Sequence, residues 1–80
     1  GINEGFMPIF NEPETLTDYE LLIFDRWGEL LFESHNPQEP WLGIYQGQLV
    51  KEEAYVWKLN YKDGRSYQKE SVIGHVTVLK

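Results

Sequence analysis

Hydrophobic and polar positions divide the segment 19–34 into two apolar runs around one polar break. The runs cover 21–24 and 30–32, and the break between them is Asp25-Arg26-Trp27-Gly28. Short apolar runs that flank a Gly-containing tetrapeptide predict two strands joined by a tight turn, here over 19–26 and 29–34. Gly28 can adopt the positive φ that such a turn needs at its end. A helix through the same window would place Gly28 in its interior, at a cost of about 1 kcal/mol relative to Ala, so we favour the hairpin.

Large apolar side chains alternate with other residues in the segment 54–61. The alternating set is Tyr55, Trp57, Leu59 and Tyr61. This period of two predicts a strand of an antiparallel sheet with one face toward water. Asp63-Gly64 predicts a hairpin turn, and 67–79 is the expected return strand. Gly74 inside that strand indicates a bulge or a close backbone approach.

The other segments are shorter. Met7–Phe10 is apolar enough for a strand, and Pro8 restricts it to a sheet edge because proline has no N–H. We expect polar connections over 11–18 and 35–40, and an irregular loop over 41–48 that Trp41 and Tyr45 pin to the core. About six to seven short strands and no convincing helix predict an all-β fold, a small antiparallel immunoglobulin-like β-sandwich.

Composition limits the classes of partner. The chain of 80 residues is one domain's length, and its net charge of −6 disfavours nucleic acid and anionic membranes. No apolar run approaches the roughly 18–20 residues of a membrane span. The sequence shows no signal peptide and opens on Gly1 without Met, so we expect a fragment of a larger secreted protein. Without cysteine, the core depends on three Trp, five Tyr and four Phe residues.

Candidate chemistry is sparse, and we predict no enzyme, no cofactor and no metal site. Ser34 and His35 are adjacent, which does not place a nucleophile and its base correctly. Asn3 and Glu4 offer oxygen ligands in a Gly-containing loop, but Ca²⁺ takes about six. A solvated loop is therefore the preferred interpretation there.

The aromatic residues allow two interpretations. Trp27, Trp41, Trp57 and Tyr45 would form a sugar-stacking row if all were exposed. We favour core positions for Trp41 and Trp57 and a rim position for Trp27. Arg26 either locks the turn, by pairing with a carboxylate or stacking on an aromatic ring, or belongs to a recognition surface.

The hairpin sequence carries a more specific signal. Residues 23–34, I-F-D-R-W-G-E-L-L-F-E-S, strongly resemble the I-F-N-R-W-G-E-x-V-F-E-S core of the gliding-motility-associated C-terminal domains. These are the type B sorting domains of the type IX secretion system in Bacteroidota. Residues 41–47 resemble the family's W-D-G-x-Y-x-G loop, 54–63 its G-V-Y-x-Y strand and Y-x-D turn, and 74–80 its terminal G-x-V-T-L-x-[KR]. Leu42 departs from the pattern because it stands where the family usually has Asp, and Glu53 stands where it usually has Gly.

The resemblance implies a non-catalytic C-terminal secretion signal that directs a fused N-terminal cargo across the outer membrane. The implied partner is the type IX outer-membrane machinery, with the periplasm as transit and the cell surface or exterior as destination. Recognition is expected at Arg26, Trp27, Gly28 and Glu29, and along the last strand at Gly74, His75, Val76, Thr77, Val78, Leu79 and Lys80, by strand addition. The expected structural positions are Asp25, Trp41, Gly43, Tyr45, Gly47, Tyr55, Trp57, Asp63 and Gly64. The alternative is an accessory sandwich that binds carbohydrate or another cell-surface partner, and it requires a row of exposed aromatics.

Overall fold

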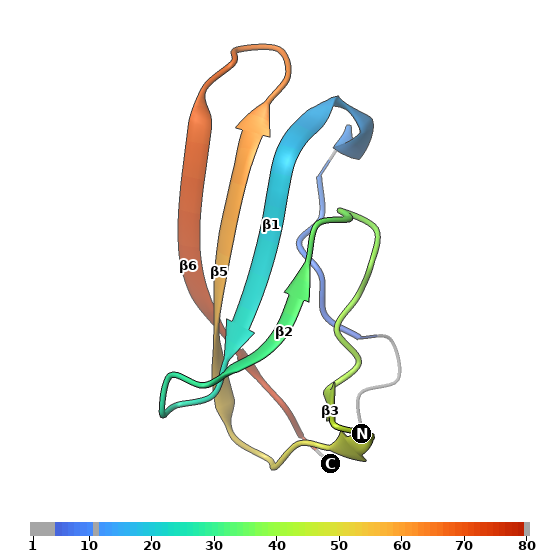
Figure 1. Ribbon diagram of the computed structural model, residues 1–80, viewed down its shortest axis with the longest axis vertical. Coiled ribbons are helices and arrows are strands. Elements are labelled where there is room, and N and C mark those ends of the chain that lie inside the picture. The colour runs from blue at the N-terminus through green and yellow to red at the C-terminus, as the bar shows by residue number, and fades with distance from the viewer. Residues whose placement is uncertain (1–4, 11, 80) are drawn as a thin grey trace.

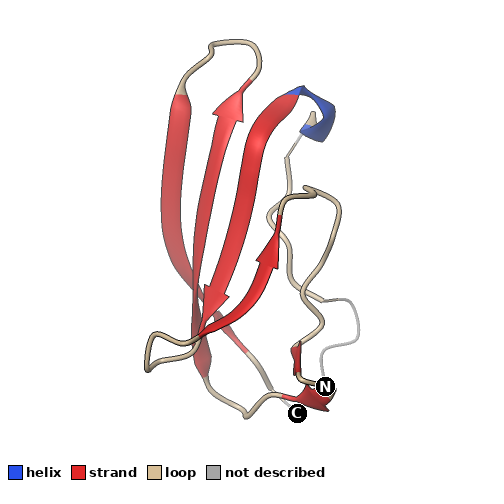
Figure 2. Ribbon diagram, viewed as in Figure 1, coloured by secondary structure: helices blue, strands red, loops and turns tan. Residues whose placement is uncertain are grey.

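Six strands form two antiparallel sheets in the computed structural model, which describes residues 5–10 and 12–79 (Figures 1 and 2). The strands are β1 (Leu16–Phe24), β2 (Leu30–Ser34), β3 (Ile44–Tyr45), β4 (Gln48–Leu49), β5 (Ala54–Asp63) and β6 (Lys69–Thr77), and one 3-10 turn covers Pro13–Thr15. The larger sheet has the order β2-β1-β5-β6, and β3 pairs with β4. The predicted all-β antiparallel sandwich is therefore confirmed. No helix in the described part is long and apolar enough to cross a membrane.

β1 and β5 are the two inner strands of the larger sheet, since both edges of each are paired. Leu21 lies opposite Ser34 of β2 and Leu59 of β5, and Ile23 lies opposite Trp57. Leu21 and Ile23 are completely buried. Each such side chain contributes about 1.5–3 kcal/mol relative to an exposed one. The apolar run that defines the hairpin in the sequence is thus also the middle of the core.

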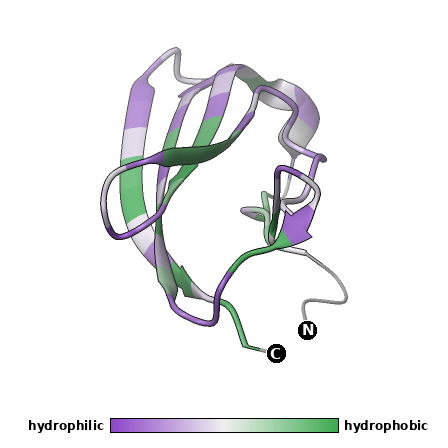
Figure 3. Ribbon diagram, turned by 60° about the horizontal axis from the view of Figure 1, so that its bottom comes forward, coloured by the Kyte–Doolittle hydropathy of each residue, from purple (hydrophilic) through white to green (hydrophobic). Residues whose placement is uncertain are grey.

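Extended segments from outside the sheet cover its inner face. Phe6 and Trp41 exchange two backbone hydrogen bonds of 2.8 Å. The Trp41 ring packs edge-on against Tyr55 at 5.4 Å, and Phe10 does the same against Tyr61 at 5.1 Å. Figure 3 shows these segments across from the four-stranded sheet. The second layer of the sandwich is therefore largely loop, anchored by aromatic rings.

Three local predictions were wrong. Residues 7–10 form no strand, since the pairing with Trp41 stops at Phe6 and Pro8 cannot donate. β1 begins at Leu16 instead of residue 19. Its pairing with β5 continues into this additional part after a shift of register between Thr17 and Glu20. The 41–48 loop contains the β3–β4 hairpin, whose turn at Gln46 and Gly47 has φ values of 52° and 81°. Positive φ at both central residues is the requirement of a type I′ turn.

The predicted β5–β6 hairpin is confirmed. Its two glycines, Gly64 and Gly74, lie where another part of the chain comes too close to leave room for a Cβ. Gly64 donates to the Thr15 carbonyl at 2.8 Å. A Cβ there would lie 2.2 Å from that oxygen. At Gly74 a Cβ would lie 2.3 Å from Cζ2 of Trp57, the residue opposite in the register. The close backbone approach expected at Gly74 is therefore correct, and the indole of Trp57 causes it.

Candidate recognition surface

The turn between β1 and β2 is held by the side chain of Asp25. One carboxylate oxygen, Oδ1, accepts hydrogen bonds from the backbone N–H groups of Trp27 and Glu29, both at 2.9 Å. The Asp25 N–H donates to the Glu29 carbonyl at 3.0 Å, and Gly28 donates to the Asp25 carbonyl at 3.1 Å. Gly28 has a φ of 86°. Asp25 and Gly28 thus hold the turn, which leaves the two side chains between them free to point outward.

Arg26 and Trp27 form the exposed tip of this turn. The Arg26 guanidinium lies 4.9 Å from the centre of the Trp27 ring, and 79% of Trp27 is exposed. A cation over an indole face at this distance is weakly attractive at an exposed site. Arg26 Nε also lies 3.7 Å from a carboxylate oxygen of Glu53. The tip therefore presents a cation–aromatic pair to the surroundings.

A shallow groove of about 220 Å³ runs from this turn toward the segment 45–55. Trp27, Glu29 and Tyr45 lie along it, together with Lys51 and Glu53. The Tyr45 hydroxyl donates to Glu29 at 3.0 Å, and this bond to a carboxylate raises the pKa of Tyr45. Tyr45 therefore belongs to the rim of the groove, and the expectation that it is pinned to the core was wrong.

The free edge of β6 is the second part of the surface. β6 is the last strand in its sheet, so no described strand pairs with its outer edge. The segment 71–77 contains no Lys, Arg, Asp or Glu, the charges that commonly protect such edges. Ile73 is 65% exposed there. This edge has the properties of a site for strand addition.

Beyond β6 the chain turns inward. Val78 is 3% exposed and donates its N–H to the Glu53 carbonyl at 3.1 Å, whereas Leu79 is 68% exposed. Lys80 lies outside the described residues. The described part of the expected recognition segment, residues 74–79, therefore consists of an open strand edge, an anchor at Val78 and an exposed Leu79.

Glu53 connects the two expected recognition segments, although sequence reasoning assigned it no role. Its carboxylate pairs with Arg26 and its carbonyl accepts from Val78. In the register, Phe24 lies opposite Val56, and Val56 lies opposite His75. The hairpin turn and the end of β6 therefore lie at the same end of the sheet, about two strand spacings or 10 Å apart. The one available signal was that Glu53 departs from the glycine of the resembled family.

The nine residues expected at structural positions differ in how deeply they are buried. Trp41, Gly43 and Tyr55 are buried, Asp25, Tyr45, Trp57, Asp63 and Gly64 are half-buried, and Gly47 is exposed. Trp41 lies in the core and Trp57 and Tyr45 are half-buried, so among the four rings considered only Trp27 is strongly exposed. Tyr67, another strongly exposed aromatic, lies in the loop between β5 and β6 at the opposite end of the sheet. This arrangement does not favour the carbohydrate-binding alternative.

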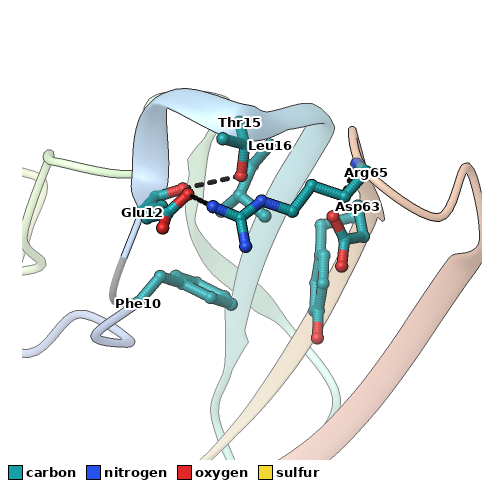
Figure 4. A pocket seen from close by; sticks show the side chains of 7 residues that line it. Phe10, Glu12, Thr15, Leu16, Asp63 and Arg65 are labelled. Carbon is teal, nitrogen blue, oxygen red and sulfur yellow. Dashed lines mark hydrogen bonds and ion pairs between the residues drawn. The ribbon is translucent and has the colours of Figure 1, made fainter.

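A separate hollow of about 230 Å³ lies at the end of the sheet away from the β1–β2 turn (Figure 4). Arg65, from the β5–β6 loop, reaches across it to pair with Glu12. Thr15 closes the 3-10 turn by donating its hydroxyl to the Glu12 carbonyl at 2.8 Å. These contacts tie the N-terminal segment to the β5–β6 loop, which gives this hollow a structural explanation.

Ser34 and His35, considered for catalysis, do not contact each other through their side chains. The Ser34 hydroxyl donates to Glu39 at 2.6 Å, whereas the His35 ring contacts Glu33 and the Tyr19 carbonyl. Ser34 and His35 thus have different partners. Asn3 and Glu4, considered for calcium, lie outside the described residues.

Comparison with known proteins gives one result. A family model described as CHU_C Type IX secretion signal domain matches residues 1–78. No curated protein and no solved structure matches the chain. The family match covers nearly the whole chain, including the hairpin turn, the 41–47 loop and β6.

Proposed function

Because the chain belongs to the CHU_C type IX secretion signal domain family, we propose that it directs a cargo protein, fused to its N-terminal side, across the outer membrane. The family match supports a secretion-signal role and export to the cell surface or the extracellular space. In this proposal the cargo passes through the periplasm, and the type IX outer-membrane machinery reads the folded domain. Families of this kind are generally non-catalytic, and we assign the domain no enzymatic activity.

The residue-level proposal rests on the two contacts of Glu53. Its carboxylate pairs with Arg26 and its carbonyl accepts a hydrogen bond from Val78, so the Arg26–Trp27 tip lies beside the end of β6. One binding partner can therefore contact both segments at the same time. The unpaired edge supplies main-chain affinity through strand addition, and the tip and the groove supply side-chain specificity.

Export of a reporter tests the role of the whole domain. Residues 1–80 are fused to the C-terminus of a reporter that carries a signal peptide, in a bacterium with type IX secretion. We expect the fusion outside the cell and the unfused reporter in the periplasm. Equal retention of the two reporters, with the domain shown to be folded, would contradict the proposal.

Two substitutions test the surface itself. Trp27→Ala removes the exposed ring, and Tyr67→Ala is the matched control because Tyr67 is 75% exposed at the other end of the sheet. Ile73→Lys places a charge beside the open edge of β6, which opposes strand addition. We expect Trp27→Ala and Ile73→Lys to reduce export and Tyr67→Ala to leave it unchanged. Equal export by all three folded variants would show that neither the Trp27 tip nor the β6 edge is needed for export.

A further inference from the structure

Three potential metal ligands converge on the outer face of the β1–β2 pair, although their sequence spacing gave no indication of a site. One ligand atom each from Glu20, Glu33 and His35 lies within 4.8 Å of the other two. Leu21 lies opposite Ser34, and both point into the core. Glu20 and His35, one position further along each strand, therefore point outward and toward each other. Glu33 follows on the same outer face.

The imidazole of His35 is oriented as metal-binding histidines are. Its Nδ1 lies 3.0 Å from the backbone carbonyl of Tyr19 and donates to it. Its Nε2 faces the carboxylates and lies 2.7 Å from Glu33 Oε2. A ring nitrogen that donates to a backbone carbonyl fixes the ring and leaves the other nitrogen for the ion.

Glu20 is supported by residues outside the cluster. Asn60 Nδ2 on β5 donates to Glu20 Oε1 at 3.0 Å, and Ser71 on β6 donates to Asn60 Oδ1 at 2.8 Å. This chain of hydrogen bonds crosses three strands and ends on the carboxylate. Outer partners of this kind hold a ligating carboxylate in place.

We propose that Glu20, Glu33 and His35 bind one divalent transition-metal ion of the zinc class. One imidazole nitrogen and two carboxylate oxygens form a donor set that zinc accepts, at about 2.0–2.2 Å. Ligands at that distance lie about 3.4 Å apart around a tetrahedral ion. Glu33 and His35 are exposed, so small side-chain rotations close the remaining gap. Calcium is disfavoured because it takes six to eight oxygen ligands.

The ion would lie between His35 Nε2 and Glu33 Oε2, which are 2.7 Å apart without it. The two carboxylates neutralise its charge, and the net charge of −6 attracts cations to the domain. Lys58, which lies opposite Leu22 on the same face, is the positive group that opposes binding. The bound ion joins β1 to β2 where the chain leaves the sheet for the turn at 35–40, and the fourth position is left to water or to a ligand from a partner.

Calorimetric titration of the purified chain with zinc chloride at pH 7.5 tests the site. We expect saturable binding of one ion per chain. His35→Ala removes the nitrogen ligand, and Glu20→Gln keeps the shape of the side chain without its charge. Each is expected to weaken binding by more than about tenfold. His75→Ala is the matched control, because His75 is also an exposed histidine on the outer face of the same sheet. It is expected to bind zinc as the unsubstituted chain does.

The affinities can be compared once circular dichroism shows the same fold for every variant. A zinc-dependent shift of the His35 ring nitrogen resonances, together with the expected order of affinities, would support the site. Absence of saturable binding would overturn it. Equal affinity of His35→Ala and the unsubstituted chain, or an equal loss in His75→Ala, would also overturn it.

Discussion

Replacement of Asp25 tests whether a single acceptor oxygen holds the hairpin turn. Oδ1 of Asp25 accepts two backbone hydrogen bonds of 2.9 Å, from Trp27 and Glu29. Asp25→Ala removes both and leaves the two donors to water. Asp25→Asn keeps an acceptor oxygen in the same place and removes only the charge. The pair of variants therefore separates the geometric role of the side chain from its charge.

The size of the effect follows from the number of bonds and their exposure. A typical hydrogen bond contributes about 0.5–1.5 kcal/mol net. Two bonds at a partly exposed turn give about 1–2 kcal/mol for Asp25→Ala, similar to the loss of an Asp cap from a helix. In a domain of this size, each kcal/mol lowers Tm by about 4–8 °C. We expect Asp25→Ala to lower Tm by about 4–16 °C and Asp25→Asn to remain within about 4 °C of the unsubstituted chain.

Thermal and urea unfolding at pH 7, followed by circular dichroism, measures both variants. The urea midpoint should fall for Asp25→Ala with an unchanged m-value, because the surface exposed on unfolding is the same. A loss for Asp25→Asn equal to that for Asp25→Ala would show that the charge matters and the acceptor does not. A stable Asp25→Ala variant would show that Gly28 and the flanking strands hold the turn without the side chain.

Three further predictions concern other parts of the fold. Gly64→Ala should destabilise the domain by about 1–3 kcal/mol in urea unfolding, since its Cβ would meet the Thr15 carbonyl at 2.2 Å and backbone cannot move aside cheaply; an unchanged midpoint would contradict the contact. Trp27→Ala should change stability by less than about 0.5 kcal/mol, because the ring is 79% exposed, and a larger loss would assign Trp27 a structural role. The hydrogen bond to Glu33 raises the pKa of His35 above its usual value. Protonated His35 therefore stabilises the fold below about pH 6.5, and this contribution disappears as pH rises through the higher folded pKa. Metal-free unfolding from pH 5.5 to 8.5 should show this loss in the unsubstituted chain and in His75→Ala, but not in His35→Ala; the same profile in all three would refute it.

The strands were predictable where burial follows a simple period. Leu21 and Ile23 alternate with less buried neighbours in β1, and Tyr55 and Leu59 do the same in β5. The β1–β2 and β5–β6 hairpins were predicted from their turn residues, whereas the β3–β4 hairpin was not. The boundaries were less predictable, since β1 extends back to Leu16 through an irregularity that leaves no trace in the hydrophobic pattern.

The covering layer was predicted less well, because its contacts are long-range. Met7–Phe10 has the composition of a strand, yet only Phe6 pairs, and its partner is Trp41. Phe10 instead packs its ring against Tyr19 and Tyr61. Local composition contains no information about partners so far away in the chain.

The sequence by itself determined the family, the all-β class and the β1–β2 and β5–β6 hairpins, because these depend on short-range periodicity and on turn residues close together in the chain. Only the tertiary structure decided how the recognition surface is assembled. Arg26 and Val78 meet at Glu53 because the register places the β1–β2 turn and the end of β6 at one end of the sheet. The turns fix the register inside the β1–β2 and β5–β6 hairpins, but β1 and β5 are far apart in the chain, and their register follows from the burial of one face of each strand rather than from a local motif.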